Sequence, residues 1–247
     1  MVHVKSREVL LETADVLESA LEKIERLESL SEKEKSKVKK FLREAVENFR
    51  ALAPGIEKDN EELAEFFFKK AKELKLMSTD KAIEREGKKN YLRAVNKVLL
   101  YSRSAKYDFI PNTLVELKKA YRKYIFGMTS FFVLTGAYLN QFFAITALIL
   151  AIPIILSMLS LQRRGYTGLL LAYASAPIPL VVGFNALIYS LGALRDPNQI
   201  SVIAEHLGKS PSFAQAYLVF LLLLAAVEVY LVSSGLLGLY RHRHAFL

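Results

Sequence analysis

Residues 125–161 read IFGMTSFFVLTGAYLNQFFAITALILAIPIILSMLSL, a run of 37 residues without Asp, Glu, Lys or Arg. As one straight helix, which rises ~1.5 Å per residue, this run is about 55 Å long, nearly twice the ~30 Å hydrocarbon thickness of a bilayer. The run therefore predicts two membrane crossings with a turn between them. We expect the turn at Asn140-Gln141, where two amide side chains are adjacent.

Charged residues are divided unequally between the two halves of the chain. Residues 1–123 hold 28 of the 34 Lys and Arg and 22 of the 25 Asp and Glu. A soluble globular domain does not separate its charges in this way, so we expect a charged head followed by a membrane domain. The chain has no cysteine, which excludes disulfides, thiolate metal ligands and a cysteine nucleophile. Abundant Lys and Glu without cysteine also suit a thermophilic protein.

The head, residues 1–111, has the pattern of an all-α domain. Its apolar residues recur at spacings of three, four and seven, which is typical of helical hairpins and coiled-coil-like packing. Capping boxes mark helix starts, and Pro54-Gly55 ends a helix. Period-two alternation, which would predict strands, is missing. The expected helices are at about 6–30, 32–52, 59–77 and 80–109, with Gly87 as a bend in the last of them.

The remaining residues, 112–247, predict a polytopic α-helical membrane domain with four transmembrane helices. Arg and Lys flank the first, second and fourth spans, and an even number of spans places all of these cations on one side. We therefore expect a multi-pass protein of the cell membrane with both termini in the cytoplasm. The expected spans are 124–139, 142–161, 168–194 and 213–240, with a short interfacial helix at 197–207.

Glu228 lies near the middle of the expected fourth span. An ionised side chain at mid-bilayer costs roughly 2.5–3.5 kcal/mol, so the sequence predicts either a partner or a protonated carboxyl. Asn185 lies at comparable depth in the third span, and Tyr189 and Tyr138 lie nearer the outer side. Two interpretations remain open. In the first interpretation, Glu228 forms a proton- or cation-binding site with Asn185 and Tyr189. In the second, Glu228 holds the bundle together by hydrogen bonds between helices.

The third span contains two prolines that predict a kink. Pro177 and Pro179 each remove a backbone donor, and Gly183 follows them. Broken helices at mid-depth expose carbonyl groups, which transporters use for ion sites. An ordinary kink accommodated by neighbouring small residues is the favoured explanation of the pattern.

A basic juxtamembrane segment is the second strong signal. Residues 69–123 hold 16 Lys and Arg against six Asp and Glu, whereas residues 1–30 have more acidic than basic side chains. Such a segment predicts contact with an anionic cytoplasmic leaflet, or docking of an acidic partner, either a protein or, less favoured, RNA or a ribosome surface. The residues expected to contact anionic lipid are Lys118, Lys119, Arg122, Lys123, Arg163, Arg164, Arg241 and Arg243.

Signatures of enzymes and metal sites are missing from the sequence. There is no phosphate-binding Gly-rich loop, no His-Glu-x-x-His helix and no Gly-x-Ser-x-Gly elbow. His242 and His244 are two residues apart, whereas helical metal sites usually use spacings of three or four. We therefore expect no enzyme activity, no catalytic residue, no metal and no cofactor.

Two functions are compatible with these patterns. In the first, the chain is a membrane scaffold of the assembly-platform type, whose basic helical head docks a partner or self-associates. In the second, it is a small oligomeric channel, carrier or insertase-like protein, with an intramembrane polar site around Glu228 and Asn185.

Overall fold

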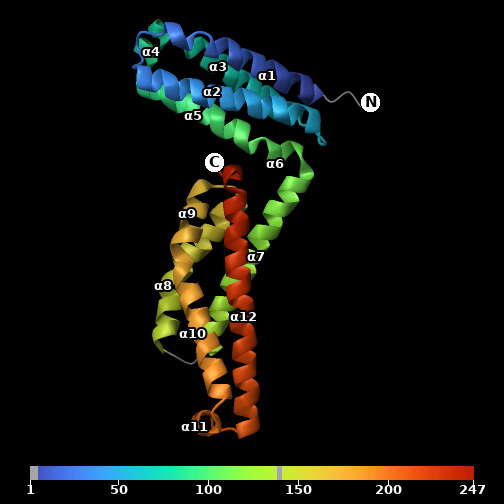
Figure 1. Ribbon diagram of the computed structural model, residues 1–247, viewed down its shortest axis with the longest axis vertical. Helices are drawn as coiled ribbons and strands as arrows, with labels where there is room; N and C mark the ends of the chain where they lie inside the picture. Colours follow the sequence, from blue (N-terminus) through green and yellow to red (C-terminus); the bar gives the residue numbers. More distant parts are fainter. Residues whose placement is uncertain (1–4, 138–140) are drawn as a thin grey trace. The chain divides into compact units, whose positions relative to one another are not determined.

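The computed structural model describes residues 5–137 and 141–247, and Figure 1 labels its helices. These described residues form α-helices and short 3-10 helices, and they contain no β-strand. They divide into two units, one that ends at Val115 and one that comprises residues 116–246. The chain is therefore all-helical, as the sequence predicts, and the two units are described separately below.

The first unit is a bundle of four main helices. α1 contacts both α2 and α3, and α5 contacts the same two helices from the other side. Their apolar stripes meet in one core that includes Leu10, Leu42, Phe49, Phe67 and Tyr91. The unit is thus a closed four-helix bundle rather than an extended coiled coil. Its elements are α1 (Lys5–Leu21), η1 (Ile24–Arg26), α2 (Glu32–Leu52), η2 (Ala53–Gly55), α3 (Glu61–Met77), α4 (Asp80–Glu86), α5 (Lys88–Ser104) and α6 (Lys106–Phe109).

Two expected helix bounds are corrected by the structure. The first helix ends at Leu21 rather than near residue 30, because the chain leaves the helix to bury Leu27 and Leu30 in the bundle. The expected helix 80–109 is three helices. Its first break is at Gly87, whose φ of 88° is strained for residues with a side chain. Its second break is at Ala105.

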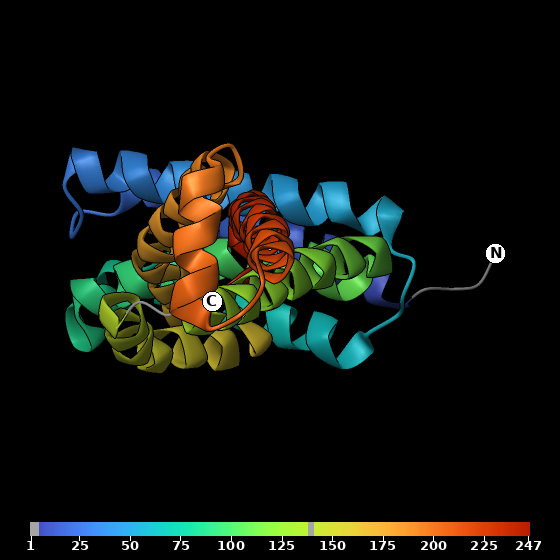
Figure 2. The same ribbon diagram turned by 90° about the horizontal axis from the view of Figure 1, so that it is seen from below.

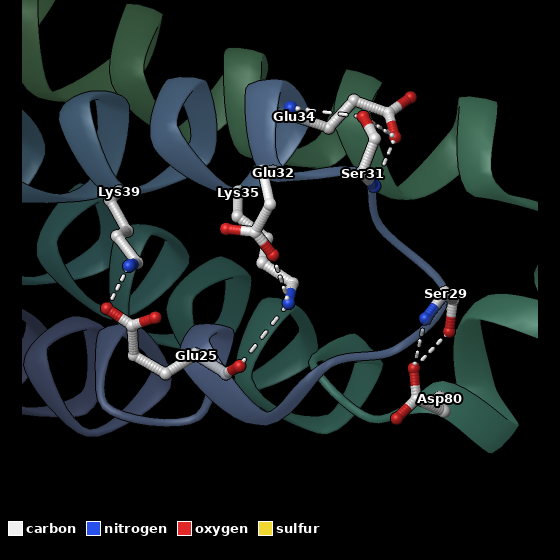
Figure 3. Close-up of polar contacts among 8 residues, drawn as sticks. All are labelled: Glu25, Ser29, Ser31, Glu32, Glu34, Lys35, Lys39 and Asp80. Atoms are coloured by element: carbon white, nitrogen blue, oxygen red, sulfur yellow. Dashed lines mark hydrogen bonds and ion pairs between the residues drawn. The ribbon is translucent and has the colours of Figure 1, made fainter.

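Serine and aspartate side chains hold the connections of the head together. Ser31 and Glu34 form a capping box at the start of α2, in which the Ser31 N–H donates to Glu34 over 2.9 Å (Figure 3). Ser29 donates its N–H to Asp80 Oδ1 over 2.8 Å and its hydroxyl to the same oxygen (Figure 3). Ser6 makes the same pair of bonds to Asp59 at the start of α3. These hydrogen bonds hold the pKa of both aspartates below the ordinary range.

The second unit contains the apolar helices. Among the described residues, three helical stretches are long and apolar enough to cross a membrane: residues 144–162, 166–194 and 211–241. α7 is not one of these three. The helices are α7 (Pro111–Ala137, which begins in the first unit), α8 (Gln141–Gln162), α9 (Tyr166–Ser175), α10 (Pro177–Leu194), α11 (Pro197–Leu207) and α12 (Pro211–Arg241), followed by η3 (Arg243–Ala245).

α10 and α12 lie side by side (Figure 1), and Figure 2 shows α12 nearly end-on. α8 packs in the same way against α9. Gln141 is the first residue of α8, whereas Asn140, the other half of the expected turn, lies outside the described residues. Residues 138 and 139 of the expected first span, and with them Tyr138, also lie outside that part of the chain.

α7 runs antiparallel to α12 in close contact. Near the start of α7, Glu116 Oε2 lies 3.8 Å from His242 Nε2, and at its end the Ala137 carbonyl accepts a hydrogen bond from the Tyr217 hydroxyl. Glycines permit the approach between these points: a Cβ on Gly235 would lie 2.6 Å from the Tyr124 backbone nitrogen. Glu116 and Ala137 are 21 residues apart, a rise of about 31 Å. α7 therefore accompanies α12 over a bilayer-like distance.

Candidate functional site

One cluster of exposed cations in the head lies on α5. Lys89, Arg93 and Lys97 are exposed and four residues apart, so they form one stripe along the helix. Within the described residues none of the three forms an ion pair. The other two cations of α5 are paired with α2: Lys88 lies 3.1 Å from Glu34, and Arg103 binds Glu44 at 2.6 Å. We call Lys89, Arg93 and Lys97 the basic ridge.

A groove lies on each side of the basic ridge. The groove between α2 and α5 has a volume of about 540 Å³, and the groove between α3 and α5 about 380 Å³. Arg93 lines both grooves. Apolar side chains form their floors, Val38 and Phe41 in the first groove and Leu74 and Val98 in the second. The head thus presents a row of cations between two grooves that combine apolar and charged side chains.

Glu34 is an acid that lines the first of these grooves. It accepts hydrogen bonds from the Ser31 backbone N–H and hydroxyl, and Lys88 Nζ lies 3.1 Å away. These groups hold the pKa of Glu34 below its ordinary value, with the Ser31 bonds contributing most. Glu34 therefore already has partners within its own bundle. The cations of the basic ridge are left to bind an external anion.

Glu228 is the second candidate site, and the structure buries it completely. Its exposed fraction is 0%, and among the described residues neither carboxyl oxygen has a hydrogen-bond partner. The buried residues of α12 alternate in spacings of four and three, which places Glu228 in the seam that faces neighbouring helices. They are Ala214, Leu218, Leu221, Ala225, Glu228, Val232, Gly235 and Leu239.

The carboxyl group of Glu228 occupies the space above Gly183 of α10. A Cβ at position 183 would collide with Oε2 of Glu228 and lie 2.6 Å from a methyl group of Val229. The buried face of α10 continues with the small residues Ala186, Ser190 and Ala193, which let the helices approach closely. Gly183 is therefore the residue that accommodates Glu228, a role that its spacing from the prolines did not suggest.

Asn185 and Tyr189 are not brought together with Glu228. Both are exposed, on the side of α10 that faces away from the buried stripe containing Gly183. The expected polar pocket of Glu228, Asn185 and Tyr189 is thus not formed. Pro177 and Pro179 lie where α9 ends and α10 begins, with Ala176 between the two helices in a helical conformation.

The cations expected to contact lipid gather at one end of the second unit. The Arg164 Nε donates to the Ala245 carbonyl over 3.0 Å, which joins the α8–α9 turn to the end of the chain. Arg243 stacks over Tyr240, with its guanidinium carbon 4.7 Å from the ring centroid. Arg163 is exposed beside Arg164 in the same turn.

A groove of about 480 Å³ at this end collects three of the expected cations. Lys119 and Lys123 line it from α7, and Arg241 lines it from α12. Lys118 and Arg122 are exposed on α7 but do not line this groove. Glu116, Ser234 and His242 also line it, and the sequence analysis did not select them. Glu116 lies three residues before Lys119 and Ser234 lies seven residues before Arg241, spacings that keep each on the same helix face as its cation, whereas His242 is adjacent to Arg241 and no spacing identifies it.

Comparison of the chain with models of protein families, with curated proteins and with solved structures finds no match. Among the described residues, no group of three His, Asp or Glu side chains is placed to hold a metal ion.

Proposed function

We propose that this protein is a membrane-anchored scaffold whose head docks an acidic helical segment of a partner protein on the basic ridge. The observation that carries the proposal is the stripe of Lys89, Arg93 and Lys97, which is exposed and unpaired within the described residues and flanked by two apolar-floored grooves. An amphipathic acidic helix supplies both matching features, carboxylates for the basic ridge and apolar side chains for a groove.

The proposed anchor has four transmembrane helices, with α7 as the first. α7 accompanies α12 from Glu116 to Ala137, and its Tyr124 is fully buried. The Tyr124 hydroxyl lies 3.2 Å from Ser157 Oγ of α8, and Ser157 in turn donates to the Gly168 carbonyl of α9 over 3.0 Å. These contacts support α7 as an integral member of the bundle. The lysines of α7, Lys118, Lys119 and Lys123, lie within two helical turns of Glu116. Long side chains at such a position reach water beyond the membrane.

The same proposal places both chain ends in the cytoplasm. The cations in the first half of α7, after α8 and at the end of α12 lie at one end of the second unit, as the contacts of Arg164 with Ala245 and of Glu116 with His242 indicate. Cationic loops favour the cytoplasmic side of a membrane.

The environment of Glu228 favours the scaffold over a channel or carrier. Its side chain is closed between α10 and α12 and has no exposed surface, so it lines no open path in this conformation. We assign it to the packing of these two helices.

Binding of a designed peptide to the full-length protein in detergent tests the docking role. The probe is a labelled helical peptide with Glu at every fourth position and Leu beside it, compared with a scrambled peptide of the same composition. Reversal of the ridge charges with Lys89→Glu, Arg93→Glu and Lys97→Glu should weaken binding more than tenfold. The control, Lys58→Glu, Lys69→Glu and Lys81→Glu, makes the same charge change at exposed lysines that line neither groove.

Equal weakening by both triple variants would reduce the interaction to net charge and contradict a specific ridge. Equal binding of the ordered and scrambled peptides would contradict the helical recognition. Ridge-dependent binding of an RNA oligonucleotide with little binding of either peptide would also overturn the proposal, in favour of a nucleic-acid partner.

A further inference from the structure

The groove between α7 and α12 is built from two matching stripes. Glu116, Lys119, Ala120 and Lys123 lie on one face of α7, and Ser234, Leu237, Gly238 and Arg241 lie on one face of α12, with His242 beside them. Both stripes have a small residue at the same point, and a Cβ on Gly238 would lie 2.5 Å from the Ala120 Cβ. The helices therefore touch at Ala120 and Gly238, and the longer side chains on either side form the walls of the groove.

The groove is amphiphilic along its length. Toward the chain's end it is bounded by Lys119, Arg241 and the Glu116–His242 pair. In the other direction Leu237 is 61% exposed, and Lys123 Nζ lies 5.5 Å from the ring centroid of Tyr230, which is 62% exposed. Tyrosine and lysine at this position mark the boundary between headgroups and hydrocarbon. Cationic groups thus lie at headgroup level above an exposed apolar surface.

The cations of the groove carry more charge than their surroundings neutralise. Within the described part of the chain, neither Lys119 nor Arg241 forms an ion pair, and Lys123 contacts an aromatic ring rather than a carboxylate. Head cations such as Lys5, Arg50 and Arg103 are paired with glutamates or aspartates. Among the described residues, Glu116 is the one acid that lines the groove, and its carboxyl oxygen lies 3.8 Å from His242 Nε2.

We propose that this groove seats the headgroup of one anionic phospholipid. Its phosphate would lie between Lys119, Lys123 and Arg241, and an acyl chain would lie over Leu237 toward Tyr230. The apolar half of the groove selects a lipid over a free phosphate ion, because a soluble anion gains nothing from Leu237. The inference rests on the proposed placement of α7 and α12 in the bilayer and is independent of docking by the head.

Native mass spectrometry of the full-length protein in detergent tests this seat. A micelle of neutral detergent has no anionic leaflet, so diffuse attraction to a charged surface does not contribute. The protein is titrated with phosphatidylglycerol and with phosphatidylcholine of identical acyl chains. We expect tighter binding of phosphatidylglycerol, and Lys119→Gln with Lys123→Gln should weaken it roughly 30-fold, at about 1 kcal/mol for each direct contact with the phosphate that is lost.

The matched control is Lys118→Gln with Arg122→Gln, which removes the same charge from the same turns of α7 outside the groove. It should leave phosphatidylglycerol binding within about twofold of wild type, because diffuse electrostatic effects are small in the micelle. Arg241→Gln removes a cation from the α12 side of the groove. This substitution alone should also weaken the binding of phosphatidylglycerol.

Three results would overturn the inference: equal loss in the two double variants, no preference for phosphatidylglycerol, or displacement of the lipid by its soluble glycerophosphoglycerol headgroup at similar concentration. The last result would identify a free-anion site. Failure of the proposed topology would appear in a different measurement, the sidedness of the chain ends, and failure of the docking role would appear only in peptide binding.

Discussion

At the scale of single residues, Glu228 combines full burial with two carboxyl oxygens that have no hydrogen-bond partner in the described part of the chain. A buried polar group without a partner lowers stability by roughly 1–3 kcal/mol relative to one that is satisfied or replaced. The methionine side chain has a similar length and needs no hydrogen-bond partner. It is also flexible enough to fill an irregular space.

We therefore expect Glu228→Met to raise the stability of the protein in detergent by about 1–3 kcal/mol. The measurement is thermal unfolding followed by circular dichroism. Glu205→Met, at an exposed position of α11, is the control and should change the midpoint little. A clear loss of stability in Glu228→Met would show that the carboxyl has a partner in the membrane-embedded protein.

The two Ser–Asp contacts of the head predict a pH dependence. The pKa values of Asp59 and Asp80 are lowered in the folded state, chiefly by hydrogen bonds from Ser6 and Ser29. The folded state therefore binds fewer protons than the unfolded state, and this contribution is present above the ordinary aspartate pKa near ~4 and lost as the pH falls through the lowered values.

Replacement of both residues, with Asp59→Asn and Asp80→Asn, should lower the unfolding temperature of the head at pH 7. The difference from wild type should shrink between about pH 4 and pH 2. Hydrogen exchange of peptides from α1, α3 and α4 in the full-length protein measures this difference in stability at each pH, after correction for the intrinsic pH dependence of exchange. A difference that stays constant across this range would mean that the charges of the two aspartates do not stabilise the fold.

At the scale of elements, glycines decide how closely α7 approaches α12. A Cβ at Gly235 would lie 2.6 Å from the Tyr124 nitrogen, a backbone atom that cannot rotate away. A Cβ at Gly192 of α10 would meet no other heavy atom within 4 Å. Gly235 therefore permits close helix packing and Gly192 does not, although both lie in apolar helices.

Gly235→Ala should destabilise the protein by about 1–3 kcal/mol, because the added methyl group forces the two helices apart. Gly192→Ala, the matched control, should leave the unfolding temperature unchanged or slightly higher. Thermal unfolding in detergent compares the two variants. Equal midpoints would argue against close contact between α7 and α12.

The elements also show what the sequence could and could not predict. Capping residues and glycine predicted the start of α2 and the bend at Gly87, because these signals act through local hydrogen bonds and backbone conformation. The surroundings of Glu228 could not be predicted in the same way. Depth along a span places Asn185 beside it, but the rotation of α10 turns Asn185 outward and presents Gly183.

The basic ridge illustrates the same limit. The sequence showed a net positive segment at residues 69–123, but not which of its cations are neutralised. Lys88 and Arg103 belong to the same helix as the ridge and are paired with Glu34 and Glu44 of α2, more than 50 residues away in the chain. Such pairing depends on the packing of the bundle, which local patterns do not specify.

At the scale of the whole molecule, the proposed four-span topology can be tested directly. Reporter tags at the N- and C-termini should be protected or accessible together in sealed vesicles, because the cations at both ends favour the same side. The assay is protease digestion of right-side-out and inverted vesicles, with a tag inserted between α11 and α12 as the reporter for the opposite side. Tags on opposite faces would indicate an odd number of spans and exclude α7 as a crossing.

The contact between Glu228 and Gly183 constrains how this chain can change during evolution. Since a side chain at position 183 collides with the carboxyl group of Glu228, the two positions share one volume. Enlargement at 183 becomes tolerable only after position 228 has shortened, so the order of substitutions matters. Among descendants of this gene, we expect the sizes of these two residues to vary in opposite directions, although 44 other residues separate them along the chain.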